Sequence, residues 1–337
     1  MATLNPKSTG NGNTGSGGTG STPAKQAPTP NTITGIFANQ KAPAVNGVAA
    51  LLNGQVVSFT APSAAGAPST TLPSGLTSPV HITGDLTNGV AVANTTAIYY
   101  STGVGVAGAA WYSLPLPKGM TNIVAMCGDL ANGLVITDGT NIYSWQFTGT
   151  AAQEWTLLAA LPTAGQVVAD MAGDPTNGLL LVIGGGTGPS SLYWGGMGCS
   201  CSWVPVTSAG TSLPQARVQV QMVCGSYANG FVLFGESQLF TLTGMKYTPS
   251  TSTTTGNCAA SLAKVSGPVP FTITDMAGDA TNGLTVRSGT SGLIAFAMSP
   301  YASWSVVNAV TPPAPPSTGS TNTGSDADTG APLAEAA

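Results

Sequence analysis

The chain has 337 residues, of which 42% are hydrophobic and only 6% are charged, and its formal net charge is −4 at pH 7. An ordinary globular protein has about 25% charged residues, and charge normally keeps proteins soluble and monomeric. Its scarcity favours a protein that works packed among other subunits or outside a cell. With only eight lysines and arginines, the chain lacks the clustered basic surface that nucleic-acid binding needs, so we expect no nucleic-acid partner.

The N-terminal segment, residues 1–30, is rich in Gly, Ser, Thr and Pro and almost free of large apolar side chains. Such a segment cannot bury enough apolar surface to offset its ordering entropy, so we expect a disordered arm. It lacks the apolar core of a signal peptide, and no stretch of the chain reaches the roughly 18 apolar residues of a membrane span. We therefore expect a protein that is made in the cytoplasm and does not span a membrane.

After this arm, the dipeptide Asn-Gly recurs in a fixed setting at six places, most fully within the motif Gly-Asp-x-x-Asn-Gly. The asparagines of the six copies are Asn46, Asn88, Asn132, Asn177, Asn229 and Asn282. Successive copies are 42, 44, 45, 52 and 53 residues apart. A four-stranded propeller blade has a period of about 40–50 residues, so the spacing indicates one blade for each copy.

Each repeat predicts four short strands. An apolar strand precedes the motif, as in residues 167–172, and a second follows it at once, as in residues 178–183. We expect Asn-Gly to form the hairpin turn between them, because both residues tolerate the positive φ of such turns. The third strand carries an aromatic residue and the fourth often begins with Trp. No segment has sustained helical periodicity, so the pattern is that of an all-β protein.

Four-stranded sheets with two apolar faces bury both of them when they stack around an axis. We therefore predict an all-β fold, a six-bladed β-propeller of four-stranded antiparallel blades over residues 31–310, with all six asparagines on one face. The expected blades span approximately 31–79, 80–121, 122–165, 166–217, 218–270 and 271–310. A β-solenoid is a minor alternative, because it would need a shorter repeat.

Residues 31–310 resemble β-propellers in general. The fourth-strand Trp, preceded by small or polar residues, is similar to the repeats of sialidase-type and plant assembly-factor propellers. The Ser-x-Asp-x-Gly box of the sialidase type and the Trp-Asp dipeptide of other propellers are absent. The resemblance therefore implies a fold and no particular activity.

The Asp of the repeated motif is the first candidate for a functional residue. It occurs in four repeats, with Ser226 at the matching place in a fifth, and the set is Asp85, Asp129, Asp174 and Asp279. These residues either form a ring of cation ligands or accept hydrogen bonds from backbone N–H groups of their own turns. We favour the structural role, because neighbouring blades lie too far apart for two copies to share an ion, and we expect no metal and no cofactor.

A second candidate set lies four residues before that Asp and consists of His81, Asp170 and Asp275. The inner strand of a propeller blade lines the axial channel, so these side chains are expected to face a shared polar cavity. A histidine with two carboxylates is able to exchange protons or bind a divalent metal. The three residues belong to non-adjacent blades, and propeller channels are normally polar, so we favour a polar channel lining without a catalytic role.

Cysteine and tryptophan provide the remaining candidates. Cys199 and Cys201 lie in a predicted loop of the fourth blade and Cys258 in the matching loop of the fifth, so a disulfide from Cys258 to either is feasible in an oxidising compartment. Three thiols without a fourth ligand make a weak zinc site, and Cys127 and Cys224 are expected to be small core residues. The fourth-strand tryptophans either stack on sugars or pack between blades, and we favour packing; they are Trp111, Trp155, Trp203 and Trp304.

The C-terminal segment, residues 311–337, is rich in Pro, Ser, Thr and Gly and carries three acidic side chains. We expect a second disordered arm. Either arm is a simple linker or the attachment to a larger assembly. The N-terminal arm is the more suitable tether, because acidic residues would be repelled from a negatively charged shell.

The sequence predicts a protein that is not an enzyme. A sialidase-like propeller needs clustered arginines, and this chain has only Arg217 and Arg287. The composition favours a non-catalytic structural or adhesion module of a virion, such as an appendage, decoration or tail protein of a bacteriophage. Its expected partners are other virion subunits, bound through the arms, and a host-surface glycan. A carbohydrate-binding propeller lectin is the alternative function.

Overall fold

A computed structural model describes most of the chain between residues 33 and 307. The described residues belong to one compact unit within residues 31–337. The described residues are 33–38, 48–52, 55–59, 69–85, 89–104, 109–147, 154–158, 160–161, 165–184, 190–195, 203–208, 211–212, 219–248, 256–267, 269–270, 272–288 and 294–307. The predicted arms, 1–30 and 311–337, lie outside them.

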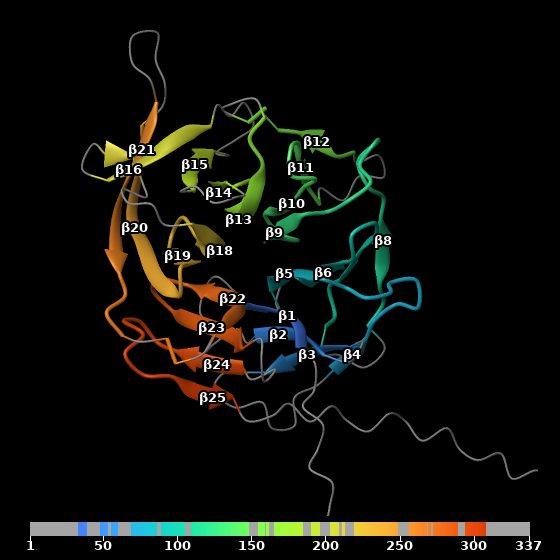
Figure 1. The fold of residues 1–337 in the computed structure, drawn as a ribbon. Helices are drawn as coiled ribbons and strands as arrows, with labels where there is room; N and C mark the ends of the chain where they lie inside the picture. The colour runs from blue at the N-terminus through green and yellow to red at the C-terminus, as the bar shows by residue number, and fades with distance from the viewer. Residues whose placement is uncertain are drawn as a thin grey trace, which may run out of the picture. The chain divides into compact units, whose positions relative to one another are not determined.

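All regular secondary structure in this part of the chain is β-strand. The strands form six successive groups of four, and within each group a strand pairs antiparallel with the next one along the chain (Figure 1). The first three groups are β1 (Ile33–Ala38), β2 (Val48–Leu52), β3 (Gln55–Phe59) and β4 (Ser69–Thr71); β5 (His81–Asp85), β6 (Gly89–Ala93), β7 (Ile98–Ser101) and β8 (Tyr112–Leu114); and β9 (Ala125–Asp129), β10 (Gly133–Thr137), β11 (Ile142–Trp145) and β12 (Thr156–Leu157). The last three are β13 (Val168–Asp174), β14 (Gly178–Ile183), β15 (Ser191–Gly195) and β16 (Val204–Ser208), with the short extra strand β17 (Thr211–Ser212); β18 (Val220–Ser226), β19 (Gly230–Gly235), β20 (Gln238–Thr248) and β21 (Asn257–Lys264); and β22 (Ile273–Asp279), β23 (Gly283–Ser288), β24 (Ile294–Ala297) and β25 (Ser305–Val307).

The first strand of each group is the innermost. These inner strands contact one another in the order β1, β5, β9, β13, β18 and β22, and β22 contacts β1 again, so the groups form a closed ring (Figure 1). Six four-stranded groups around one axis make a six-bladed β-propeller, which confirms the predicted fold. The described residues form strands and turns, and among them there is no helix long and apolar enough to cross a membrane.

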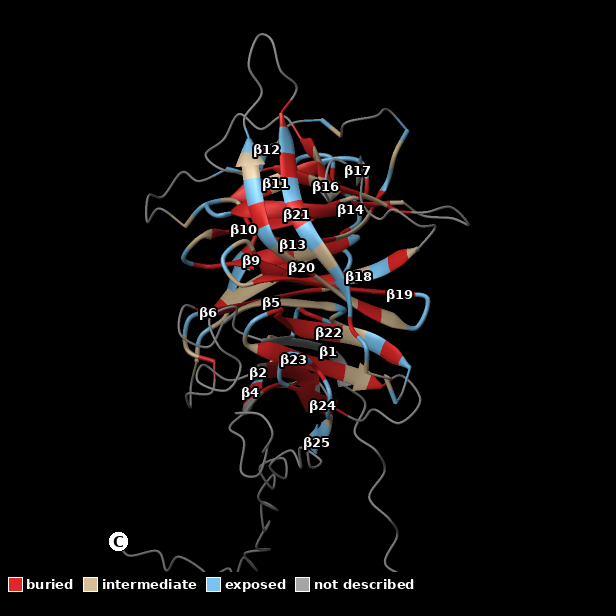
Figure 2. Ribbon diagram, turned by 90° about the vertical axis from the view of Figure 1, so that its left-hand side faces the viewer, coloured by how far each residue is buried: buried red, intermediate tan, exposed pale blue. Residues whose placement is uncertain are grey.

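The apolar core lies between the blades. In β14, Leu179 and Leu181 pack in a cluster with residues of the third blade, whereas Leu180 and Val182 pack in a cluster with residues of the fifth. Successive side chains of a strand point to opposite faces, so a strand that is covered on both faces needs the unbroken apolar run seen here. Figure 2 shows the result, with buried residues along the central strands and many exposed residues on the long hairpin β20–β21.

In the third to sixth blades, where the turn is described, the repeated motif closes the hairpin between the first two strands. In the fourth blade, Gly173 and Gly178 have φ values of 96° and 117°, and no described asparagine has a positive φ. The prediction that Asn adopts positive φ in this turn was therefore wrong. Asn177 instead donates its side-chain amide to Asp174 (3.0 Å), whose carboxylate also accepts the backbone N–H groups of Thr176 (3.0 Å) and Asn177 (2.7 Å).

Adjacent turns are also hydrogen-bonded to each other. Thr176 Oγ1 donates to the carbonyl of Asn132 in the preceding blade (2.9 Å), and Thr281 Oγ1 donates to that of Asn229 (2.8 Å). The described turns of neighbouring blades therefore lie side by side at one end of the channel. Asn46 and Asn88 lie outside the described residues.

The fourth and fifth blades are joined at the rim, which the sequence did not predict. β16 pairs in parallel with β21, with Val206 opposite Cys258, so the two blades share one sheet. Residues 250–261 have the composition of a loop, but Asn257–Lys264 forms a strand because β20 and β16 offer pairing partners on both sides. Cys258 is therefore a strand residue and not the loop residue that we expected.

Candidate functional site

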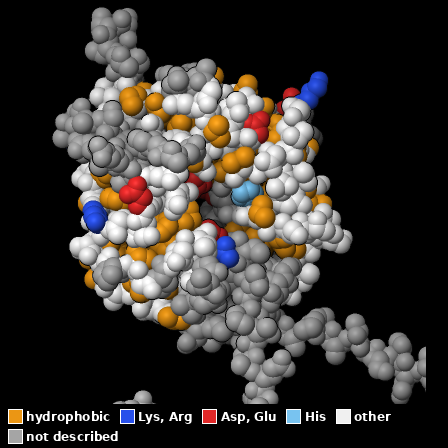
Figure 3. Space-filling view, viewed as in Figure 1, with side chains coloured by type: hydrophobic (Ala, Val, Ile, Leu, Met, Phe, Trp, Pro, Cys, Tyr) orange, Lys and Arg blue, Asp and Glu red, His pale blue; other side chains and the backbone are white. Residues whose placement is uncertain are grey.

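The inner strands enclose a cavity of about 570 Å³. Its described lining comes from β5, β9, β13, β18, β22 and the turns that follow them, and it includes His81, Asp170 and Asp275. Figure 3 shows the hollow at the centre of one face, with hydrophobic and acidic side chains around it. The structure thus brings the three candidates to one channel, on three different blades.

Side chains of the inner strands alternate between the two neighbouring blades. Residues four and two positions before the motif Asp face the next blade, and the residue three positions before it faces the preceding one. Thr83 Oγ1, for example, donates to the carbonyl of Gly128 in the next blade (2.6 Å), and Ala172 packs in one cluster with Val223. This register decides which channel-side residues meet.

His81 begins β5 and is half-buried beside the third blade. Its Nε2 lies 3.3 Å from the carbonyl of Ile123, to which it donates if it carries the proton. Burial lowers the pKa of the imidazole below its ordinary value, and the bond to Ile123 partly opposes that change. A neutral ring with Nε2 protonated is the form that fits this contact.

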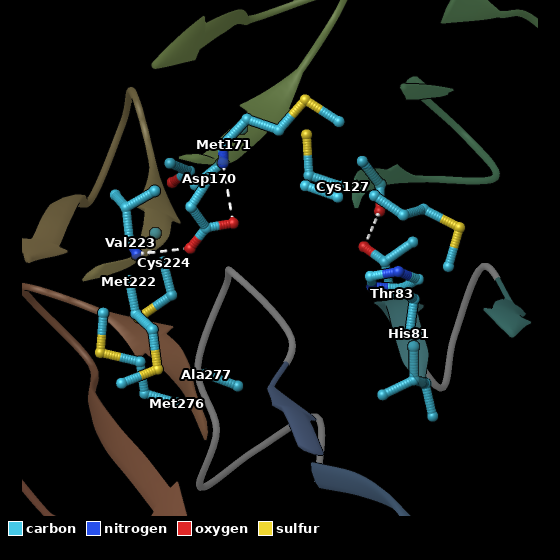
Figure 4. A pocket seen from close by; sticks show the side chains of 18 of the residues that line it. His81, Thr83, Cys127, Asp170, Met171, Met222, Val223, Cys224, Met276 and Ala277 are labelled. Atoms are coloured by element: carbon cyan, nitrogen blue, oxygen red, sulfur yellow. Dashed lines mark hydrogen bonds between the residues drawn. The ribbon is translucent and has the colours of Figure 1, made fainter. Parts of the chain in front are cut away.

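Asp170 holds the fourth and fifth blades together through its carboxylate. One oxygen accepts the N–H of Met171 (2.8 Å) and the other accepts the N–H of Val223 (2.8 Å), as Figure 4 shows. Burial raises the pKa of Asp170 to about 7 against the effect of these two bonds, and the nearby charge of Asp275 adds to the rise. Asp170 therefore exchanges a proton near neutral pH.

Asp275 lies opposite Arg287 in the register of β22 and β23, and its carboxylate accepts the N–H of Met276 (2.9 Å). Arg287 also lines the channel. Among the described side chains, no three His, Cys, Asp or Glu residues come together as a metal-binding group. The arrangement of His81, Asp170 and Asp275 is a set of separate polar contacts around a channel.

A feature that sequence reasoning missed is an apolar arc at the start of the inner strands. Val80, Val124 and Val167 each precede their strand by one residue and are 48%, 37% and 50% exposed. Val80 and Val124 line the cavity, and a side chain added at Gly139 would touch both Val124 and Val167. The sequence shows only part of this signal, because Val80 and Val124 lie five residues before the motif Asp, whereas a bulge between Val168 and Asp170 places Val167 seven residues before it.

The motif carboxylates are bound within their own turns. Asp129 and Asp279 accept the same backbone N–H bonds as Asp174, at distances of 2.7 to 2.9 Å. The side chain of Asp85 lies outside the described residues. Asp279 also accepts the side-chain amide of Asn229 in the preceding blade (3.4 Å). These hydrogen bonds within and between turns support the structural role of the motif carboxylates.

The predicted disulfide falls partly outside the described residues, because Cys199 and Cys201 are not among them. Cys258 is a buried free thiol in β21, and burial raises its pKa to about 11. The disulfide stays a prediction.

Two of the fourth-strand tryptophans bind the preceding blade. Trp111 Nε1 donates to the carbonyl of Thr71 (2.8 Å), and Trp155 Nε1 donates to that of Pro115. Trp203 is buried in the cluster between the third and fourth blades. These contacts support packing between blades as the role of the tryptophans.

No family model and no curated protein sequence matches this chain. Solved structures do match. The selenomethionine-substituted virginiamycin B lyase from Staphylococcus aureus has a TM-score of 0.50 and 11% sequence identity, over 80% of this chain and 82% of the lyase. A catalytically inactive variant of that lyase with quinupristin gives 0.50 and 11%, over 83% and 85%.

YCF48 bound to D1 peptide has a TM-score of 0.46 and 12% identity, over 85% of this chain and 84% of that one. At such identities, the likeness to the lyase extends to the fold alone. The chain has the β-propeller fold.

Proposed function

We propose that this chain is a non-catalytic structural or adhesion module of a virion, and that it binds a neighbouring subunit or a host surface through its channel mouth. The observation that carries the choice of surface is the arc of Val80, Val124 and Val167. Exposed apolar side chains that gather at one place, instead of being scattered singly, mark interaction sites. In the fifth and sixth blades Gln219 and Thr272 occupy comparable places, so the arc gives the mouth one apolar side.

The polar groups of the channel support a binding role over a catalytic one. Both carboxylate oxygens of Asp170 accept backbone hydrogen bonds, and Nε2 of His81 lies against a carbonyl. These groups connect neighbouring blades, so their hydrogen-bonding capacity is directed to the ring itself. Catalytic groups, in contrast, must be able to reach a substrate.

Composition supports the virion as the location and the arms as the attachment. Only 6% of residues are charged, so few ions must lose water when the surface meets another subunit. Residues 1–30 carry little that a core would bury, which suits a tether to other virion subunits. The acidic residues of the other arm, Asp326, Asp328 and Glu335, suit it less to a negatively charged shell.

The proposal is tested by placing charge on the arc. We expect the full chain with Val80→Asp, Val124→Asp and Val167→Asp to fold normally, because these side chains are exposed, but to lose incorporation into assembled particles. Leu157→Asp is the matched control, since Leu157 is 58% exposed on the rim strand β12. Equal incorporation of the triple variant and the control would exclude the mouth as the binding surface.

The arms and the activity need separate measurements. Deletion of residues 1–30 should leave a folded propeller that no longer joins the particle, and normal assembly of that variant would disprove the tether. Turnover of a glycan or an ester by the purified protein would disprove the non-catalytic role. Binding of a host glycan that survives the three valine substitutions would favour the lectin instead.

A further inference from the structure

Three side chains lie beside the channel at each of the four described interfaces between the second and sixth blades. Two of them come from the inner strand of one blade, four and two positions before its motif Asp (Ser226 in the fifth blade). The third comes from the inner strand of the next blade, three positions before the motif Asp of that blade. Between the fifth and sixth blades, these residues are Met222, Cys224 and Met276. All three line the channel and belong to or pack against one apolar cluster.

The side chains of this interface direct their sulfur atoms toward one another (Figure 4). Met222 and Cys224 are two residues apart on β18 and therefore lie on the same face of that strand. Met276 approaches from β22 on the sixth blade. Cys224 and Met276 are 9% and 6% exposed, and Met222 is half-buried at the channel.

The other described interfaces are chemically different. The corresponding residues are His81, Thr83 and Met126 between the second and third blades, Ala125, Cys127 and Met171 between the third and fourth, and Asp170, Ala172 and Val223 between the fourth and fifth. Among these described interfaces, only that of the fifth and sixth blades has sulfur at all three positions. Apolar packing alone is satisfied elsewhere by Ala and Val, so it does not require three sulfur atoms here.

We propose that Met222, Cys224 and Met276 form a binding site for copper(I). Thiolate and thioether sulfur are the donors that select this soft monovalent ion. On binding, copper(I) forms one bond to each sulfur, and the proton of the Cys224 thiol leaves to water in the channel. The positive charge of the ion and the negative charge of the thiolate then cancel, which suits a site of low polarity.

The charges around the site favour a cation. Burial is the main cause that raises the pKa of the Cys224 thiol, and the negative charges of Asp279, Asp170 and Asp275 add to the rise. Negative potential that disfavours a bare thiolate also attracts a positive ion. Zinc normally takes four protein ligands in a closed structural site, so a three-sulfur set distinguishes copper(I) from zinc.

The test measures transfer of copper(I) from its bicinchoninate complex to the full chain, without oxygen and with ascorbate present. Cys199→Ser and Cys201→Ser are included throughout, because that Cys-x-Cys pair is itself able to bind copper(I). We expect the protein to take a single copper ion per chain. Met276→Leu should weaken binding by about tenfold or more, since changing even an indirect partner of a metal site has such an effect.

Met171→Leu is the matched control. Met171 corresponds to Met276 at the interface of the third and fourth blades, where the residue that corresponds to Cys224 is Cys127. Leu has nearly the volume of Met, so both variants should fold, and circular dichroism checks this. X-ray absorption should show only sulfur around the copper. Failure to take up copper(I), an equal loss in both variants, or loss of binding only on Cys258→Ser would each overturn the proposal.

Discussion

The inner strands are uniform at the end where they enter the repeated turn and varied at the end where they begin. At the turn end, each fully described blade places a glycine of positive φ on both sides of the turn. At the other end, the position four residues before the motif Asp is occupied by His81, Ala125, Asp170, Met222 and Asp275 in successive blades. At the turn end, the backbone leaves no room for a side chain and therefore requires glycine. At the other end a side chain fits, and residue types vary from blade to blade.

The largest expected effect comes from adding a methyl group at the uniform end. In Gly173→Ala, the new Cβ would lie 2.2 Å from the carbonyl oxygen of Gly178, at a φ of +96°. We expect a loss on the order of 3–5 kcal/mol in the free energy of unfolding, from steric conflict added to backbone strain. Urea denaturation measures it.

Gly119→Ala separates the two causes, because Gly119 has a φ of +87° and nothing within 4 Å of an added Cβ. Strain alone should lower its stability by about 1–2 kcal/mol. If both variants lose the same amount, close approach of the two strands is not what demands glycine in the motif.

The next effect concerns the carboxylate of the turn. Asp174→Ala leaves the backbone N–H groups of Thr176 and Asn177 and the amide of Asn177 without their acceptor. We expect a loss of about 2–3 kcal/mol, because Asp174 is only 1% exposed and the donors stay largely dry. Ser226→Ala, which removes a single bond of 3.3 Å to Asn229, should cost less than about 1 kcal/mol; similar losses would mean that the carboxylate is dispensable.

The smallest effect, per step of pH, comes from the varied end. Asp170 has a pKa of about 7 in the folded chain and about 3.9 in an unfolded one. Between these values the folded state binds more protons, so the contribution of Asp170 to stability falls as pH rises, by at most about 1.4 kcal/mol per pH unit.

Asp170→Asn replaces the titrating carboxyl group with an amide that stays neutral across this pH range. The stability of the variant should therefore fall less than that of the wild type between about pH 4 and pH 7. Urea midpoints across that range decide the matter. Parallel curves for the two proteins would show that Asp170 does not titrate in this window.

The same contrast explains what could be predicted from the sequence. The ring of six blades was predictable because its turns need glycines at fixed spacing, and Gly173 and Gly178 satisfy that need through local backbone geometry alone. The strand β21 was not predictable, because residues 250–261 have the composition of a loop. Asn257–Lys264 becomes a strand only through its partners β20 and β16. Tertiary context decides strands of this kind.

The candidate site was predictable only in part. The positions of His81, Asp170 and Asp275 follow from their spacing to the motif. The bond from Val223 N–H to Asp170 joins residues 53 apart, and no local pattern encodes it. Bulges at Val168/Asp170, Val220/Met222 and Ile273/Asp275 also shift the start of three inner strands, which hides from the sequence which residues share an interface.

The way in which the ring closes has a consequence for how the protein folds. No described strand of the first blade pairs with the last, so β1 meets β22 and β23 through packing and not through a shared sheet. This interface between the first and sixth blades joins the two parts of the described chain that lie furthest apart in sequence. Contacts of such long range are slow to form. The blades should therefore assemble first as an open arc, and the joint between β1 and β22 should be the last to close during folding and the first to part under load.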